Sequence, residues 1–239
     1  QAIAESIGFY SAQVNQARNL LLGMLGHDLR SPLNTILMTA QYLGALNAGA
    51  NVSDAASRLI RSGASMKALL EALIDFNRTT LGLGIKTDVA EVDLAALFGD
   101  ELEQLRGAYP GRQIELEVVG DTEGTWDSLR LQQLLRNLVV NAIDYGAPNT
   151  PVRVVLTGNE AEVLIEVKNS GPVMEKAMLD HIFDPLTRGP GQGNRGDIGS
   201  GLGLGLYIVR EVARAHGGEV TVRSDNLETV FTVRLPRRN

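Results

Sequence analysis

The stretch LQQLLRNLVVNAIDY occupies residues 131–145 of this 239-residue chain. Apolar residues recur every four positions from Leu134 to Ala142, which predicts a helix buried on one side. Asn137 and Asn141 are also four residues apart, so their carboxamides share a face of that helix. Carboxamide oxygens suit Mg²⁺, which takes oxygen ligands beside phosphate. Two such residues alone are also typical of an ordinary polar surface, so both interpretations stay open.

A second unusual stretch is GSGLGLG at residues 199–205, which leads into another expected helix. Alternating glycines leave backbone amides bare near a helix N-terminus, a geometry that binds phosphate. No Gly-Lys-Ser/Thr follows, and no strand precedes it as in a dinucleotide fingerprint. A flexible hinge would use the same glycines, so phosphate binding and a hinge are equal alternatives here.

A third stretch, VKNSGPV at residues 167–173, closes an expected strand. Asn169 supplies a side-chain acceptor for an adenine amino group, and Gly171 permits a close backbone approach. A plain strand-ending turn uses the same residue types.

The pattern from about residue 85 onward predicts an α+β domain of two layers. Strands are expected at Ile114–Val119, Val152–Thr157, Val163–Lys168, Gly218–Arg223 and Thr229–Leu235. Helices are expected at Asp93–Gly107, Ser128–Tyr145, Lys176–His181 and Gly203–His216. The glycine-rich residues 188–201 predict a long loop of the kind that serves as a lid.

The N-terminal part predicts two antiparallel helices. The first, residues 1–46, carries a heptad seam made of Ile3, Ile7, Tyr10, Val14, Ala17, Leu21 and Met24. A turn is expected over residues 47–54, with Ser53 or Asp54 capping a second helix that runs to about Thr80. The apolar stripe of that second helix is Leu59, Gly63, Met66, Leu70 and Leu73. The strict heptad favours a dimeric four-helix bundle over two helices packed on the monomer. A hinge is expected at residues 81–84.

The seam slips by one residue at the stretch GHDLRSPL, residues 26–33, and Pro32 predicts a local kink there. A helical histidine followed by a carboxylate, as in His27 and Asp28, forms a nucleophile with an attached base. An isolated histidine next to an aspartate on a helix is more often simply a solvated pair of side chains.

The composition excludes several classes of protein. The net charge of −6 argues against a nucleic-acid binder, and the lack of cysteine excludes disulfides and thiolate chemistry. The three histidines lie far apart, so a histidine-rich metal site is not expected. No apolar run is long enough to span a membrane, so no membrane contact is expected. The chain starts without Met or a signal peptide, so we interpret it as a cytoplasmic fragment of a longer protein. The sequence leaves open whether that longer protein is anchored to a membrane.

Together and in this order, these stretches resemble a sensor histidine kinase of two-component signalling, over nearly the whole chain. In that family an ATP domain of the Hsp90, gyrase and MutL class phosphorylates a histidine on a dimeric bundle. The phosphoryl group then passes to an aspartate of a response-regulator receiver domain. The residues that carry the resemblance are the His27 stretch, the helix with Asn137 and Asn141, residues 169–171, IFDPLTR at 182–188, and residues 199–205.

The resemblance implies a helical hairpin at residues 1–82 that forms the dimeric four-helix bundle. A hinge with a first strand at 83–92 follows, then a Bergerat-type (GHKL) α/β sandwich ATPase domain at 93–239 with a lid at about 186–200. The implied function is an autophosphorylating kinase, a phosphotransferase that uses ATP and Mg²⁺. Its partners are a second copy of the chain and a receiver domain.

The resemblance also implies residue roles. His27 is the phosphoacceptor, Asp28 its base or orienting carboxylate, and Arg30 organises the γ-phosphate region. Ser31 stands where Thr or Asn often supports dephosphorylation of the regulator. Asn141 holds Mg²⁺ with Asn137 assisting. The implied nucleotide-binding residues are Asn137, Asn141, Tyr145, Asn169, Gly171, Phe183, Arg188, Gly199, Gly201, Leu202, Gly203 and Leu204.

Some positions depart from the family pattern. Asn169 stands where many members have Asp, and a carboxamide still accepts a hydrogen bond but brings no charge. Asp144 stands where a basic residue is common and would repel phosphate, unless Arg188 or Arg195 offsets it. Val173 replaces a glycine. His181 and His216 have no role in this scheme and are interpreted as structural.

Two other functions stay open. One is a catalytically inactive signalling scaffold that dimerises and docks partners without binding ATP. The other is an ATPase of the same fold that uses ATP for conformational cycling, independently of His27. The intact His27 and glycine stretches favour the kinase.

Overall fold

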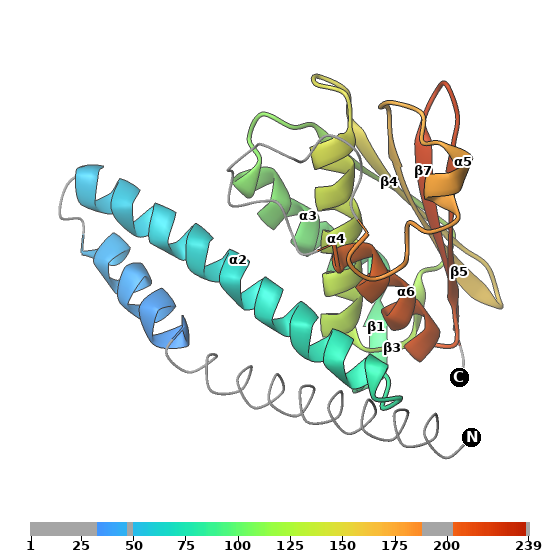
Figure 1. The fold of residues 1–239 in the computed structure, drawn as a ribbon, viewed down its shortest axis with the longest axis horizontal. Helices are drawn as coiled ribbons and strands as arrows, with labels where there is room; N and C mark the ends of the chain where they lie inside the picture. The colour runs from blue at the N-terminus through green and yellow to red at the C-terminus, as the bar shows by residue number, and fades with distance from the viewer. Residues whose placement is uncertain (1–32, 47–49, 188–202, 238–239) are drawn as a thin grey trace, which may run out of the picture. The chain divides into compact units, whose positions relative to one another are not determined.

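The computed structural model describes residues 33–46, 50–187 and 203–237. The described residues up to Gly84 belong to one compact unit, and those from Ile85 onward belong to a second (Figure 1). The first unit is helical and the second is built on a β-sheet, which confirms the predicted α+β class. No helix in the described part of the chain is long and apolar enough to cross a bilayer.

The helical unit is a hairpin that packs through small residues. A helix over residues 33–45 is followed by α2 (Ala50–Thr80). A Cβ on Gly44 would lie 3.7 Å from that of Ala56, and a Cβ on Gly63 would lie 2.6 Å from Leu37. These contacts run in opposite directions along the two helices, so the helices are antiparallel. Small side chains at the crossing bring the two backbones close together.

The predicted start of the second helix is wrong. Helix α2 is already formed at Ala50, so Ser53 and Asp54 lie within it and do not cap it. Polar residues of this kind each cost a helix only a few tenths of a kcal/mol, which is too little to delay its start. Its end at Thr80 agrees with the predicted end of this helix. After it, Gly82 has φ +74° and donates its N–H to the Thr79 carbonyl, and the Leu83 N–H donates to the Arg78 carbonyl. This is a Schellman motif, which needs a left-handed residue after the helix.

The second unit is a two-layer sandwich around a five-stranded sheet of order β2-β4-β5-β7-β6 (Figure 1). Strands β2 and β4 are parallel, and the other neighbours are antiparallel. The strands are β2 (Ile114–Val119), β4 (Val152–Gly158), β5 (Glu162–Asn169), β6 (Glu219–Ser224) and β7 (Thr229–Pro236). The helices are α3 (Leu94–Ala108), α4 (Ser128–Tyr145), α5 (Lys176–Leu179) and α6 (Gly205–Ala215).

A small second sheet was only partly expected. Strand β1 (Ala90–Asp93) pairs antiparallel with β3 (Glu123–Trp126), and β3 is absent from the sequence expectations. Four residues that include a glycine give no readable alternation. The strand exists because Trp126 is fully buried and its indole N–H donates to the Pro236 carbonyl at 3.0 Å.

The start of α4 is fixed by a buried histidine, as the structural interpretation of His216 requires. The imidazole Nδ1 lies 2.8 Å from the Val212 carbonyl, and Nε2 lies 3.0 Å from the amide nitrogen of Asp127. Nδ1 therefore carries the proton and Nε2 accepts. Asp127 in turn caps α4 by accepting from the Arg130 N–H at 3.0 Å, and it holds the Asp88 N–H at 2.7 Å.

Candidate nucleotide site

Helix α4 places the two candidate asparagines along its length. Seven residues of its other side are buried in the core, namely Leu131, Leu134, Leu135, Leu138, Val139, Ala142 and Ile143. Asn137 donates from Nδ2 to the Gly205 carbonyl at 3.3 Å, so its carboxamide lies against the first residue of α6. Its other carboxamide atom, Oδ1, is an oxygen of the kind that Mg²⁺ takes as a ligand. Asn141, one turn further on, is half-buried.

The C-terminal end of α4 meets the end of β5. The Ala147 N–H donates to the Ser170 carbonyl at 2.6 Å. A Cβ on Gly171 would lie 2.8 Å from the carbonyl oxygen of Tyr145. Gly171 is therefore needed for packing within the protein itself, in addition to the close ligand approach that the sequence suggested.

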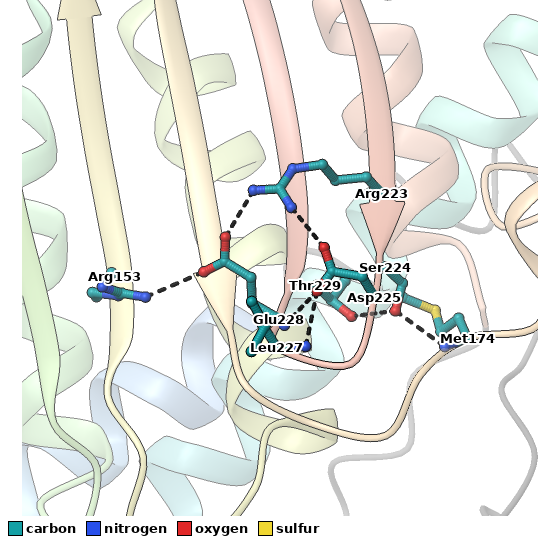
Figure 2. Close-up of polar contacts among 8 residues, drawn as sticks. All are labelled: Arg153, Met174, Arg223, Ser224, Asp225, Leu227, Glu228 and Thr229. Carbon is teal, nitrogen blue, oxygen red and sulfur yellow. Dashed lines mark hydrogen bonds and ion pairs between the residues drawn. The ribbon is translucent and has the colours of Figure 1, made fainter.

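Asn169 is buried at the edge of the same junction, with 5% of its surface exposed. It pairs with Thr229 of β7 in the antiparallel ladder, so the two side chains lie on one face of the sheet. The Thr229 hydroxyl is 2.9 Å from that of Ser224, which also accepts the Met174 N–H at 3.0 Å. Figure 2 shows this chain of bonds, which ties the segment after Gly171 to β6.

The turn beside it is held by ion pairs (Figure 2). Arg223 contacts Asp225 at 3.1 Å and Glu228 at 2.7 Å, and Arg153 of β4 reaches the other oxygen of Glu228 at 3.2 Å. Asp225 also accepts the backbone N–H groups of Leu227 and Glu228, which lowers its pKa. These contacts fix the β6–β7 turn, and hence the Ser224–Thr229 pair.

Gly203, which precedes α6, is needed partly for packing. Gly203 has φ +71°, and its carbonyl accepts the Leu186 N–H at 3.0 Å. A Cβ there would lie 2.7 Å from the carbonyl oxygen of Thr187. Leu204 is buried with 2% exposed, so its side chain belongs to the core and only its backbone is available to a ligand.

Phe183 anchors the segment that leads toward the expected lid. Its ring meets Phe231 of β7 edge-on, with centroids 6.3 Å apart. The next residue, Asp184, lies 3.4 Å from Arg210 of α6 and 2.9 Å from Nδ1 of His181. The helix predicted over Lys176–His181 ends at Leu179, so His181 lies in the turn that carries these contacts.

The charge at Asp144 has a counterpart that the sequence did not suggest. Burial raises the pKa of Asp144, and the charge of Arg112 opposes that rise. Arg112 comes from the segment before β2 and donates to the carbonyls of Ile143, Gly146 and Ala147. It thereby caps the negative end of α4 next to Asp144.

Several candidate residues lie outside the described residues: His27, Asp28, Arg30, Ser31, Arg188, Gly199, Gly201 and Leu202. The other candidates all lie in the second unit, namely Asn137, Asn141, Tyr145, Asn169, Gly171, Phe183, Gly203 and Leu204. Sequence reasoning missed Arg112, Asp184, Arg210 and the Ser224–Thr229 pair, because each acts through a contact distant in sequence. Within the described ranges, no group of three or more His, Asp or Glu forms a metal site.

Sequence families identify the class. Residues 126–239 match the histidine kinase-, DNA gyrase B- and HSP90-like ATPase family, and residues 17–82 match the His Kinase A (phospho-acceptor) domain. The chain therefore belongs to the sensor histidine kinases.

Individual relatives agree with this class. The chain is 31% identical over 229 residues to the bacteriophytochrome of Pseudomonas aeruginosa, across 96% of this chain and 31% of the relative. It is 30% identical over 233 residues to the sensor protein VanSC of Enterococcus gallinarum, across 94% of this chain and 62% of the relative. The chain thus spans less than two thirds of the length of these two relatives.

Solved structures show the same architecture. Full-length ShkA in complex with AMPPNP matches with a TM-score of 0.65 and 27% identity, over 90% of this chain and 45% of that one. The nucleotide-free catalytic domain of ThkA matches with a TM-score of 0.55 and 24% identity, over 64% of this chain and 99% of that one. The second likeness supports the fold alone.

Proposed function

We propose that this chain is an ATP-dependent kinase that phosphorylates its own His27 and passes the phosphoryl group to an aspartate of a receiver domain. The observation that carries the proposal is the convergence of three ends in one unit. These are the asparagine face of α4, the glycine entry to α6 and the Asn169–Gly171 end of β5. In ShkA, a related chain, the structure holds an ATP analogue.

The proposed nucleotide site uses these three ends differently. Asn169, with Thr229 beside it, accepts from the adenine amino group, and Tyr145 packs near the base. The phosphates lie along α4 and near the backbone amides that precede α6. Phe183 positions the segment on the open side, and Arg188, Gly199, Gly201 and Leu202 complete the phosphate contacts.

Magnesium fits the donor set of α4. Asn137 and Asn141 offer neutral carboxamide oxygens, and Mg²⁺ keeps several waters and takes phosphate oxygens as well. Bound there, the ion would neutralise charge on the phosphates. Neutral ligands leave the phosphates as the main source of negative charge, so we expect Mg²⁺ to bind together with ATP.

The proposed reaction is an in-line displacement. A ring nitrogen of His27 bonds to the γ-phosphorus while the bond from that phosphorus to the oxygen bridging to the β-phosphate breaks, and ADP leaves with the electron pair. Asp28 orients the ring through its other nitrogen, and Arg30 compensates charge on the transferred group. Ser31 keeps a hydroxyl, which we propose supports later dephosphorylation of the receiver.

The helical hairpin is proposed to dimerise. Apolar side chains remain exposed on it, including Ile36, Met38, Tyr42, Leu59 and Met66. Leu59 and Met66 belong to the apolar stripe of α2, and each is 47% exposed. A second copy would bury them in a four-helix bundle. We propose that a receiver domain docks on the same hairpin. Because both ATP and receiver domains are found in the cytoplasm, we also propose that this part of the chain lies there.

A non-catalytic scaffold is the second candidate, favoured by the carboxylate of Asp144 at the nucleotide end of α4. One experiment separates the two. The protein and His27→Gln are incubated with Mg²⁺ and γ-labelled ATP, and Asn141→Ala serves as a second variant. The kinase predicts acid-labile, base-stable label on the wild type and none on either variant. A scaffold predicts no label and no ATP binding in a separate titration.

A further inference from the structure

The segment of residues 183–187 is tied to α6 at two points. The Leu186 N–H donates to the Gly203 carbonyl at 3.0 Å, just before the helix starts. One turn and a half into the helix, Nη1 of Arg210 lies 3.4 Å from Oδ1 of Asp184. Between them, Phe183 packs edge-on against Phe231. The segment is therefore fixed by one backbone bond, one ring contact and one ion pair.

Arg210 is held in place independently of Asp184. Its side chain is only 25% exposed, and its guanidinium lies 5.5 Å from the ring centroid of Tyr207. Its Nε is buried with no hydrogen-bond partner among the described residues, and Oε1 of Glu211 lies 3.6 Å from it. A guanidinium that is packed and incompletely bonded gains more from an ion pair than a freely hydrated one.

Asp184 contacts both His181 and Arg210 through its carboxylate. Its second oxygen, Oδ2, accepts from Nδ1 of His181 at 2.9 Å. This hydrogen bond and the contact with Arg210 hold the pKa of Asp184 below its usual range, so the group is ionised at neutral pH. The Asp184 carboxylate thus links His181, in the same segment, to the guanidinium of Arg210 on α6.

The same helix contacts the asparagine face. The first residue of α6, Gly205, accepts the hydrogen bond of Asn137 at 3.3 Å. A shift of the 183–187 segment relative to α6 would therefore be a shift relative to Asn137. None of the sequence motifs points to this link, because Asp184 and Arg210 are 26 residues apart.

We propose that Asp184 and Arg210 are positioning residues for nucleotide binding: their ion pair sets Phe183 and the following backbone against the entry to α6. This inference rests on the proposed ATP site. Neither side chain needs to touch the nucleotide, so their loss should weaken ATP binding while His27 remains chemically competent.

The test is a double-mutant cycle in ATP affinity, measured by titration of a fluorescent ATP analogue with Mg²⁺, with thermal unfolding recorded for each protein. The variants are Asp184→Asn, Arg210→Gln, the double variant, and the conservative Asp184→Glu. The matched control is Arg234→Gln, which breaks a 2.8 Å pair with Glu162 within the sheet. Asp184 is a half-buried residue outside regular structure, so its variants test the proposal even where Arg210→Gln fails to fold.

We expect each single variant to raise the dissociation constant about three- to tenfold, the double variant to be no worse than the worse single one, and Asp184→Glu to recover part of the loss. Arg234→Gln should bind as the wild type does. Unchanged affinity in Asp184→Asn, or losses that multiply in the double variant, would overturn the positioning role. A wild-type protein that does not bind ATP would instead refute the proposed function.

Discussion

A methyl group on Gly171 is the sharpest test of how the nucleotide site is built. The added Cβ of Gly171→Ala would stand 2.8 Å from the Tyr145 carbonyl oxygen and 3.3 Å from Nδ2 of Asn169. The first contact is to backbone, which cannot rotate away as a side chain can. Relief therefore requires the end of α4 and the end of β5 to move apart.

The expected cost follows from that geometry. Forcing one extra carbon into a packed junction costs about 1–3 kcal/mol. For a domain of this size we expect the unfolding temperature of the sheet-containing unit to fall by about 3–10 °C. Tyr145 and Asn169 flank the clash and both belong to the proposed site, so ATP binding should weaken about three- to tenfold, less than a full ångström of misplacement would cause.

Gly99→Ala is the matched control. It makes the same chemical change inside α3, where an added Cβ meets nothing within 4 Å. Alanine there should raise the stability by about 0.5–1 kcal/mol, because glycine loses more chain entropy in a helix. Calorimetry and an ATP titration measure both variants. If Gly171→Ala melts and binds as the wild type does while Gly99→Ala gains stability, the α4–β5 contact does not constrain the site.

Three further outcomes are expected. His216→Ala should lower the unfolding free energy by about 3 kcal/mol in denaturant titration, because it leaves the buried Asp127 N–H without its acceptor. Asp144→Asn should raise the free energy of unfolding at neutral pH, by no more than about 1 kcal/mol because residue 144 is exposed to solvent. Burial raises the pKa of Asp144, so that gain should disappear as the pH falls through the folded pKa and the wild type protonates; a gain that grows in acid would contradict this cause. Gly63→Val should push Leu37 outward and destabilise the helical hairpin, seen as lower helicity by circular dichroism on heating, and unchanged melting would show that the crossing is loose.

Local patterns predicted the sheet domain well where buried and less buried residues alternate along a strand, as they do in β4 and β5. Strand β5 shows this alternation in full, with every second residue buried from Val163 to Asn169. The same logic failed at β3, whose four residues are ordered by Trp126 reaching Pro236, 110 residues later in the chain. It also failed at the start of α2, where turn-forming residue types were tolerated inside a helix.

The candidate site shows the same division between motif and contact. Spacing alone put Asn137 and Asn141 on one face, because helical geometry fixes that relation. The sequence suggested only one reason for glycine at position 171, the close approach of a ligand. In the structure, a Cβ at this position would clash with the backbone of Tyr145, and that alone would require glycine. A motif glycine can thus be demanded by packing and by ligand approach at once, and only a substitution that separates stability from affinity tells the two apart.

Arg112 and Asp144 show the same dependence on a contact that is distant in sequence. From the sequence, an acidic residue at the end of α4 looks like a defect in a phosphate site. In the structure Arg112 binds three carbonyls at that helix end and opposes the rise in the pKa of Asp144. The local charge is therefore set by a pair whose members are 32 positions apart, so the sign at position 144 cannot be judged alone. ATP affinity should then depend on both residues together: loss of Arg112 should weaken binding more in the presence of Asp144 than in an Asp144→Asn background.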